Sequence, residues 1–323
     1  MVIRSRKKYD RKRGETKGVL LAALLFFVLF PYIFSGFSET KKQTLKLEEQ
    51  PGQIWVLEHH LWGTRQILME EYLTGMVAAT IPAEYHIETL KAQAILLRSF
   101  CMSYMEKKDG KKIVDDSHLK QYYLSEKSNS KLWKDKTTEN QEKIAQAVKE
   151  TEGIVMVCEG DIINPPFCRM SNGRTRDITE YTIHLEDYKY LKSVECEEDK
   201  MAEDYIQYVE ITPKKLEKII KKHGKYEGKT VSKITLSRDK KDYVKEIKIG
   251  NTTIDGETFR KLLGLVSSTF SMEKIDDVIQ IKTKGMGHGY GFSQYSANKM
   301  ALDGKGYRDL IGYFFENFSF EKI

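Results

Sequence analysis

The chain has 323 residues, enough for one large domain or two modest ones with a hydrophobic core. Its 40% hydrophobic and 31% charged residues, with 22 glycines and 6 prolines, exclude collagen-like and low-complexity proteins. The net charge of +6 arises from lysines and arginines crowded into residues 1–17, and the remainder is close to neutral. The basic charge therefore gives no reason to expect a nucleic-acid partner.

Residues 18–37 (GVLLAALLFFVLFPYIFSGF) contain no charged side chain. A helix of that length spans about 30 Å, the thickness of the hydrocarbon core of a bilayer. The basic flank predicts a cytoplasmic tail over residues 1–17 and an extracytoplasmic remainder, in a single-pass protein of the cell membrane. A cleaved signal peptide is the alternative, for which Gly36-Phe37-Ser38 is a poor cleavage site. Polar residues 38–54 are predicted to be a linker.

The four cysteines lack the CxxC spacing of zinc sites, so we expect no metal and no other cofactor. Cys168 and Cys196 fall in loop-like segments and are candidates for a disulfide outside the membrane, with four free thiols as the alternative. Cys101 lies on the apolar face of a predicted helix, where packing is its expected role.

The first strong helix is predicted to follow Pro82, which suits a first helical turn. Apolar residues recur there at spacings of three and four: Ile87, Leu90, Ala94, Leu97, Cys101 and Tyr104. A second helix is predicted over 139–151. Strands 154–157 and 162–163 then flank the turn residues Glu159-Gly160-Asp161, which indicates a hairpin.

The second half of the chain mixes short helices and strands. The pattern predicts a loop at 171–173, helices over 213–223, 258–263, 293–302 and 307–315, and strands over 231–236, 244–249 and 278–283. Regular βαβ repetition is absent from this order, so we predict an α+β ectodomain over 55–323, with two lobes and a binding cleft.

The segment KGMGHGYGFSQYSAN (284–298) is the most unusual in the sequence. Glycine at every other position lets backbone N–H groups come close to a ligand. His288, Tyr290, Gln294 and Tyr295 add groups suited to sugar hydroxyls and rings, and Ser293 is predicted to cap the next helix. Neither a phosphate loop nor a dinucleotide fingerprint is present. The alternative is a structural turn in which His288 is a hydrogen-bonded core residue.

That segment and the block EEYLTGMVAATIPAEYHIETLKAQAILLRSF (70–100) together resemble the SpoIID/LytB family. The family has a YLxGVVAxEMPxxFxxEALKAQAVAARTY block near its start and a GxGHGxGMSQYGA block near its end. Further agreement lies between the two blocks, in DDSHLKQYY, SNGRT and YLKSV. The resemblance extends over about residues 55–318.

The resemblance implies an outward-facing lytic transglycosylase of peptidoglycan that acts in sporulation, during engulfment. Its implied substrate is glycan strands that lack stem peptides, and its implied partners are the amidase SpoIIP and the membrane protein SpoIIM. One carboxyl group acts as acid and then as base, while the C6 hydroxyl of the sugar closes a 1,6-anhydro ring. An internal nucleophile needs no second carboxylate to position water.

The sequence departs from the family at the residue that matters most for cleavage. Thr80 stands at the position of the catalytic glutamate in the Glu-Met-Pro triplet, and a hydroxyl is too weak an acid to protonate a leaving group. Glu84, one turn further on, is a candidate replacement, and stabilisation of the helix dipole is its alternative role. Glu88 also fits the family block. Arg98 takes the family's arginine position and is expected to hold the cleft or the glycan, with a solvated surface charge as the alternative.

Three functions are therefore consistent with the sequence. The first is an active transglycosylase with a relocated acid. The second is a silent glycan-binding module of the amidase-enhancer (LytB-like) kind, and the third is an envelope scaffold. In the first two, both blocks should line one groove. The predicted glycan-binding residues are Arg98, Gly287, His288, Gly289, Tyr290, Gly291, Ser293, Gln294 and Tyr295.

Overall fold

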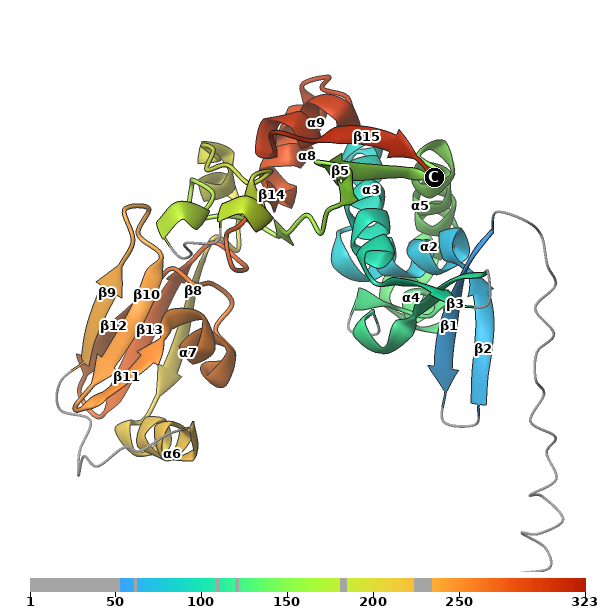
Figure 1. The fold of residues 1–323 in the computed structure, drawn as a ribbon. Coiled ribbons are helices and arrows are strands. Elements are labelled where there is room, and N and C mark those ends of the chain that lie inside the picture. Colours follow the sequence, from blue (N-terminus) through green and yellow to red (C-terminus); the bar gives the residue numbers. More distant parts are fainter. Residues whose placement is uncertain (1–52, 61–62, 109–110, 120–121, 181–184, 224–233) are drawn as a thin grey trace, which may run out of the picture. The chain divides into compact units, whose positions relative to one another are not determined.

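The computed structural model describes residues 53–60, 63–108, 111–119, 122–180, 185–223 and 234–323 (Figure 1). The predicted cytoplasmic tail, the predicted span at 18–37 and nearly all of the predicted linker lie outside these residues. No helix within the described ranges is both long enough and apolar enough to cross a bilayer. The described residues of Gln50–His59 and Gln66–Ile323 form one compact unit of mixed helices and strands. The α+β class is confirmed, and the division into two lobes stays a prediction.

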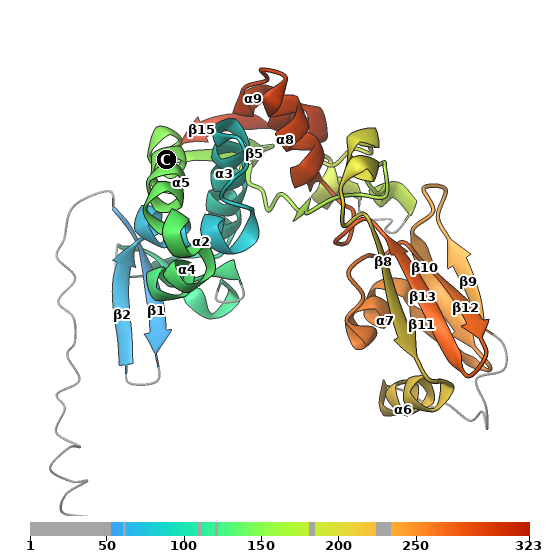
Figure 2. The same ribbon diagram turned by 180° about the vertical axis from the view of Figure 1, so that it is seen from behind.

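The first part of the chain combines one mixed sheet with a group of helices. Strands β1 (Ile54–His60), β2 (Gly63–Leu68), β3 (Met105–Lys108) and β4 (Lys111–Asp115) are ordered β2-β1-β4-β3, with β1 and β4 parallel. The helices are α2 (Met69–Thr80), α3 (Ile87–Ser103), α4 (Glu126–Trp133) and α5 (Thr137–Glu150). Helix α3 contacts both α2 and α5 (Figures 1 and 2), and almost all of its middle turns are buried.

Two helices, rather than one, flank Pro82. The prediction missed α2 and placed Pro82 in the first turn of the long helix, which instead begins at Ile87. A proline disfavours helical backbone in the residue before it, and Ile81 is extended with φ −141° and ψ 146°. Helix α2 therefore ends at Thr80, and Pro82 lies in a turn closed by a hydrogen bond from Tyr85 N to Pro82 O (3.1 Å).

The last part of the chain completes the core begun by α3. Helices α8 (Gln294–Leu302) and α9 (Tyr307–Phe314) both contact α3. Strand β5 (Ile154–Cys158) lies between β6 (Asp161–Ile162) and β15 (Ser319–Lys322), antiparallel to both. The predicted hairpin is confirmed, because β5 and β6 are joined through Glu159 and Gly160 at positive φ.

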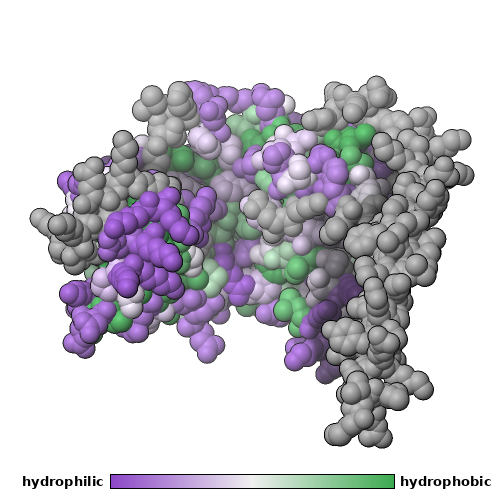
Figure 3. Space-filling view, turned by 90° about the horizontal axis from the view of Figure 1, so that it is seen from below, coloured by the Kyte–Doolittle hydropathy of each residue, from purple (hydrophilic) through white to green (hydrophobic). Residues whose placement is uncertain are grey.

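Between these parts lies a segment with its own hydrophobic core. Strands β8 (Ile206–Ile211), β12 (Phe270–Ile275) and β13 (Val278–Lys284) form one antiparallel sheet, ordered β12-β13-β8. A second antiparallel sheet contains β9 (Ile234–Arg238), β10 (Val244–Ile249) and β11 (Thr252–Asp255). Helices α6 (Pro213–His223) and α7 (Gly256–Leu263) contribute to the same core. Hydrophilic side chains cover the end that carries the lysine-rich α6 (Figure 3).

A pair of two-residue strands joins the loops on which the predicted site depends. Strand β7 (Phe167–Cys168) pairs in parallel with β14 (Phe292–Ser293). Met170 and Met286 exchange backbone hydrogen bonds of 3.1 and 2.9 Å, which brings the 171–173 loop against the glycine-rich segment. Short 3-10 helices lie at Asp116–His118, Lys134–Lys136, Ile178–Glu180, Leu185–Tyr188 and Glu197–Met201.

Candidate functional site

Thr80 is the last residue of α2 and lies among buried amides. Its hydroxyl donates to Met76 O (2.9 Å) and accepts from Gln93 Nε2 (3.3 Å). Gln294 Nε2 donates to Thr80 O (2.8 Å) and to Gln93 Oε1 (3.2 Å). Gln93 and Gln294 are almost fully buried. We call Thr80, Gln93 and Gln294 the Thr80 junction; it contains amide, hydroxyl and carbonyl groups, none of which is a Brønsted acid at neutral pH.

A second contact between the two sequence blocks lies one turn further along α8. Asn298 Oδ1 accepts from His86 N (2.7 Å) and from Thr89 Oγ1 (3.4 Å). These hydrogen bonds join residues more than 200 positions apart in the chain. The structure thus brings the α8 end of the glycine-rich segment against the residues around Thr80.

The two candidate replacement acids occupy different environments. Glu84 lies in the turn after α2 and is exposed. Glu88 accepts from Lys91 Nζ (2.6 Å) and from the backbone N–H of Tyr307 at the start of α9 (2.8 Å). Partial burial opposes ionisation of Glu88, but these two hydrogen bonds hold its pKa below the usual value. Glu88 therefore joins α3 to α9 as an ionised carboxylate.

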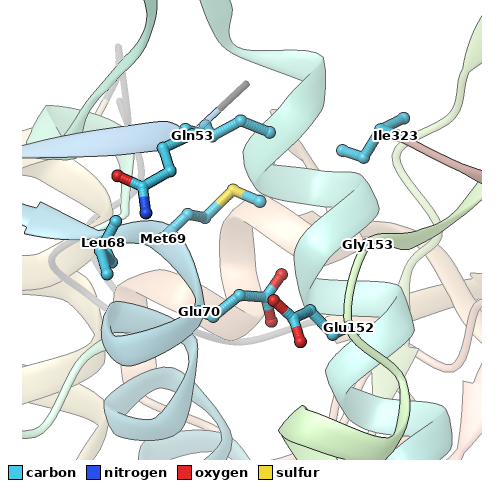
Figure 4. A pocket seen from close by; sticks show the side chains of 8 residues that line it. Gln53, Leu68, Met69, Glu70, Glu152, Gly153 and Ile323 are labelled. Carbon is cyan, nitrogen blue, oxygen red and sulfur yellow. The ribbon is translucent and has the colours of Figure 1, made fainter. Parts of the chain in front are cut away.

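Arg98 is fully buried, so the alternative of a solvated surface charge is wrong. Its Nε and one terminal nitrogen donate to the two oxygens of Glu70 (2.7 and 2.6 Å), and it also donates to the carbonyls of Ile154 and Val148. Glu70 and Glu152 line a cavity of about 190 Å³ (Figure 4). Arg98 connects α2, α3 and the start of β5, and its side chain has no exposed surface to offer a glycan.

The glycines of the 284–298 segment pack against protein. A Cβ on Gly289 would lie 2.4 Å from the ring of Tyr243, and one on Gly291 would lie 2.2 Å from Pro166 O. Both glycines have positive φ. The N–H of Gly287 donates to Val266 O (2.7 Å) and the carbonyl of Gly289 accepts from Arg176 N (2.8 Å). The backbone of Gly287, Gly289 and Gly291 therefore faces protein and forms a closely packed turn. This is the alternative given in the sequence analysis, and not the expected set of N–H groups that face a ligand.

His288 and Tyr290, which alternate with these glycines, line a pocket of about 400 Å³. Tyr290 N donates to His288 Nδ1 (3.1 Å), so the proton of the neutral imidazole is on Nε2. Burial lowers the pKa of His288 to about 4, against the opposing charge of Glu257. We call this the His288 pocket; its other lining residues include Ile178, Tyr188, Tyr190, Leu191, Glu257 and Lys261.

Glu257 is the acidic group of the His288 pocket and was not singled out in the sequence. Although burial opposes ionisation, hydrogen bonds from Arg260 and Ser268 lower the pKa of Glu257 to about 2. The pocket therefore presents a carboxylate and a neutral imidazole beside aromatic rings at neutral pH. Glu257 carries no motif signal, because it stands in the first turn of an ordinary amphipathic helix.

Residue Asp199 connects the two predicted loops and was also missed. Its buried carboxylate accepts hydrogen bonds from the hydroxyls of Ser171, Ser293 and Ser296 (2.7–2.8 Å) and from the N–H groups of Ser171 and Ser296. Burial raises its pKa, and these hydrogen bonds oppose that effect. Ser293 occupies the N-cap position of α8 as predicted, but its hydroxyl bonds Asp199 rather than the helix. Asp199 carries no motif signal, because it stands among other charged residues in the run ECEEDK.

The remaining predicted residues and the cysteines are placed as follows. Tyr295 is half-buried, with Lys299 Nζ 5.3 Å from its ring centroid. All four cysteines are free thiols, and the predicted disulfide between Cys168 and Cys196 is not formed. Burial raises the pKa values of both thiols.

One group of side chains in the described ranges has an arrangement that could hold a metal ion. The ligand atoms of His59, Asp115 and Asp116 lie within 4.8 Å of one another. His59 Nδ1 lies 2.9 Å from Asp116 Oδ1, a distance that a hydrogen bond explains. The expectation of no metal remains a prediction.

The geometry defines a class of protein with a buried polar junction at the end of α2 and a polar pocket lined by His288, both within one α+β unit. Comparison with known proteins identifies the family. The model of the SpoIID family (stage II sporulation protein) matches residues 58–158. Stage II sporulation protein D of Bacillus amyloliquefaciens is 33% identical over 269 residues, 81% of this chain and 77% of that protein.

Two further relatives extend the match. Stage II sporulation protein D of Bacillus subtilis is 32% identical over 263 residues, 80% of this chain and 75% of that protein. An uncharacterised protein of Brachyspira hyodysenteriae is 27% identical over 244 residues, 73% of this chain and 62% of that protein. The chain belongs to the SpoIID family of stage II sporulation proteins, which is involved in sporulation.

Proposed function

We propose that this protein is a SpoIID-family member that binds peptidoglycan glycan strands lacking stem peptides and does not cut them. The observation that carries the proposal is the composition of the Thr80 junction. The groups that hydrogen-bond to the hydroxyl and the carbonyl of Thr80 include Met76 O, Val77 O and the side-chain amides of Gln93 and Gln294. Protonation of a glycosidic oxygen needs a carboxylic acid whose pKa is raised in a dry site. A threonine hydroxyl bonded to amides cannot supply that proton.

The His288 pocket supports the binding part of the proposal. Aromatic rings with a few polar groups are the usual lining of a small-molecule site, and its volume of about 400 Å³ suits one or two sugar rings. The Nε2–H of neutral His288 is a donor and the carboxylate of Glu257 is an acceptor for sugar hydroxyls. In this proposal the strand is held chiefly at this pocket.

A second candidate function is cleavage with Glu84 as the acid. One observation favours it: among the described residues, no cation lies within ion-pair distance of the Glu84 carboxylate, so that group is available to a substrate. Against it stands the exposure of Glu84 to solvent, because a general acid for glycoside cleavage works best in a dry cleft. We therefore prefer binding without cleavage.

Peptide-free glycan strands distinguish the two functions. The full-length chain is incubated with strands, bound strands are measured by co-sedimentation, and 1,6-anhydro ends are sought by mass spectrometry. Binding without new ends supports the proposal. New ends that disappear in Glu84→Gln support cleavage, and Glu71→Gln, an exposed neighbour on α2, is the matched control. Failure of the chain to bind any glycan would refute both functions.

Two variants refine that experiment. Thr80→Glu restores the family's acid, and we expect it to produce anhydro ends if the rest of the site is competent. Thr179→Glu adds the same charge at an exposed position and should produce none. His288→Ala should weaken strand binding by about tenfold, the loss expected for one hydrogen bond in a desolvated site.

Location and partners complete the proposal. Residues 18–37 would anchor the protein in the cell membrane, with residues 1–17 in the cytoplasm and residues 55–323 outside. A module that holds strands would act beside an enzyme that strips their peptides, such as the amidase SpoIIP, with SpoIIM as a membrane partner during engulfment. Co-purification of the full-length chain with each of these proteins, and loss of membrane association when residues 18–37 are deleted, test this part.

A further inference from the structure

Arg169 presents an arginine side chain that the rest of the site does not use. Its guanidinium carbon lies 5.1 Å from the centroid of the Tyr85 ring. Tyr85 is 8% exposed and Arg169 is half-buried, so the guanidinium has lost part of its water. The cation–π contact holds the charge in place and leaves its N–H groups free to donate.

No acidic partner within the described ranges neutralises this charge. Other arginines in the described ranges do form ion pairs with carboxylates: Arg98 with Glu70, Arg174 with Glu195 and Arg260 with Glu257. The carboxylates of Asp204 and Glu84 affect the hydroxyl of Tyr85 electrostatically, but neither forms an ion pair with Arg169. A half-buried cation without an anion is costly, which is typical of a site that an anionic ligand completes.

Its position relates Arg169 to the Thr80 junction. The side-chain amide of Gln294 donates a hydrogen bond to Thr80 O. The backbone N–H of the next residue, Tyr295, donates to Arg169 O (3.0 Å). Tyr85, under the guanidinium, follows Thr80 by five residues in the turn between α2 and α3. Two consecutive residues of α8 therefore fix the main chain of Arg169 and the end of α2.

We infer that Arg169 recognises the lactyl carboxylate of muramic acid and thereby selects strands whose stem peptides have been removed. This inference rests on the proposed glycan-binding function. A stem peptide is joined to the lactyl group through an amide, which is neutral; its removal leaves a carboxylate on each muramic acid. The guanidinium fork binds a carboxylate through two parallel hydrogen bonds and gains much less from an amide. Arg169 is then a specificity-determining residue.

The test compares two forms of the same peptide-free strands. In one form the lactyl carboxylates are intact, and in the other they are converted to methylamides. We expect the full-length chain to bind the carboxylate form about ten- to a hundredfold more tightly, the range for a charge-assisted hydrogen-bonded pair. In Arg169→Gln the preference should disappear, with affinity for the amidated strands unchanged. Arg169→Lys, which keeps the charge but loses the fork, should show an intermediate preference.

The matched control is Arg308→Gln. Arg308 also lies over an aromatic ring, 4.7 Å from the centroid of Phe320, but on the exposed face of α9. This variant should keep the full preference. Equal binding of both strand forms by the unaltered chain, or a preference that survives in Arg169→Gln, would overturn the role of Arg169 while glycan binding stands. Absence of binding to either form would instead overturn the proposed function. Thermal unfolding of each variant shows whether it remains folded.

Discussion

The Thr80 junction and the His288 pocket each take residues from the fifteen-residue segment 284–298, yet they differ in chemistry. At the junction, Gln294 meets Thr80 and Gln93 through buried amides and carbonyls that do not titrate. At the pocket, His288 and Glu257 are both titratable and line an open volume. None of the residues that line the pocket belongs to α2, α3 or the turn between them.

This difference shows that one sequence motif contributes residues to two sites of different chemistry. The alternating glycines let the motif pass closely against Tyr243 and Pro166, and the residues between them reach the pocket. The serines and the amide that follow join the motif to Asp199 and to α2. A motif that looks like one binding loop in the sequence is therefore partly a packing element.

The largest expected effect is on the packing of the glycine-rich segment. Gly289→Ala should lower the free energy of unfolding by about 4 kcal/mol, because the new methyl group meets the ring of Tyr243 at 2.4 Å and the backbone has φ +85°. Gly304→Ala has a similar φ but nothing within 4 Å, so it should cost only about 1 kcal/mol. Urea unfolding measures both. Equal losses would mean that the glycine-rich segment is not closely packed against Tyr243.

A smaller effect concerns the pH dependence of the pocket. The pKa of Glu257 is lowered from 4.5 to about 2, so its ionised form stabilises the fold above about pH 4.5 and that stabilisation is lost as pH falls toward 2. At about 1.4 kcal/mol for each pH unit, this amounts to roughly 3 kcal/mol. The pKa of His288 is also lowered, to about 4, so the fold favours the neutral ring and loses stability as pH falls from 6.5 to 4.

Stability measured from pH 7 to pH 2 tests this assignment. Glu257→Gln should remove the part of the loss that falls below about pH 4.5, whereas Glu273→Gln, an exposed residue of β12, should leave the profile unchanged. If Glu257→Gln and the unaltered protein show parallel profiles, Glu257 does not have the lowered pKa. The Thr80 junction should contribute nothing to either profile.

The smallest effect is expected at the junction itself. Thr80→Val keeps the volume of the side chain but leaves the amide of Gln93 without one acceptor, which should cost about 1 kcal/mol. Thr253→Val, on an exposed position of β11, should be close to neutral. Thermal unfolding compares the two. A neutral Thr80→Val would show that the hydroxyl of Thr80 is not part of the hydrogen-bonded junction.

Much of the fold could be predicted from local patterns. The buried face of α3, the hairpin of β5 and β6 and the lysine-rich α6 follow from apolar periodicity and turn residues. Helix α2 was missed because MEEYLTGMVAAT is buried on most of its faces and so lacks a one-sided apolar pattern, and because Pro82 was predicted to lie in the first turn of α3. The contact of Thr80 with Gln294 agrees with the resemblance, which paired the two blocks.

The rest depends on distant contacts that leave no local signal. Asp199 has three serine partners from segments 28 and up to 97 residues away, and Glu257 faces a histidine 31 residues further along. Arg98 was expected to hold the cleft or the glycan, but only the fold reveals that Glu70 and two carbonyls take up its guanidinium. Whether a charged side chain is buried depends on contacts made by the whole chain, whereas a sequence pattern contains only the residues next to it in the sequence.

Helix α3 obtains its neighbours from both halves of the chain, and this has a consequence for how the molecule is assembled. The buried face of α3 packs against α8 and α9, which follow about two hundred residues later in the chain. The segment from β8 to β13 instead forms a hydrophobic cluster from its own residues. A contact between residues about two hundred positions apart closes a long loop, which costs chain entropy and slows folding. We therefore expect the segment from β8 to β13 to fold early. The packing of α3 against α8 and α9 should then be the final, rate-limiting step of folding.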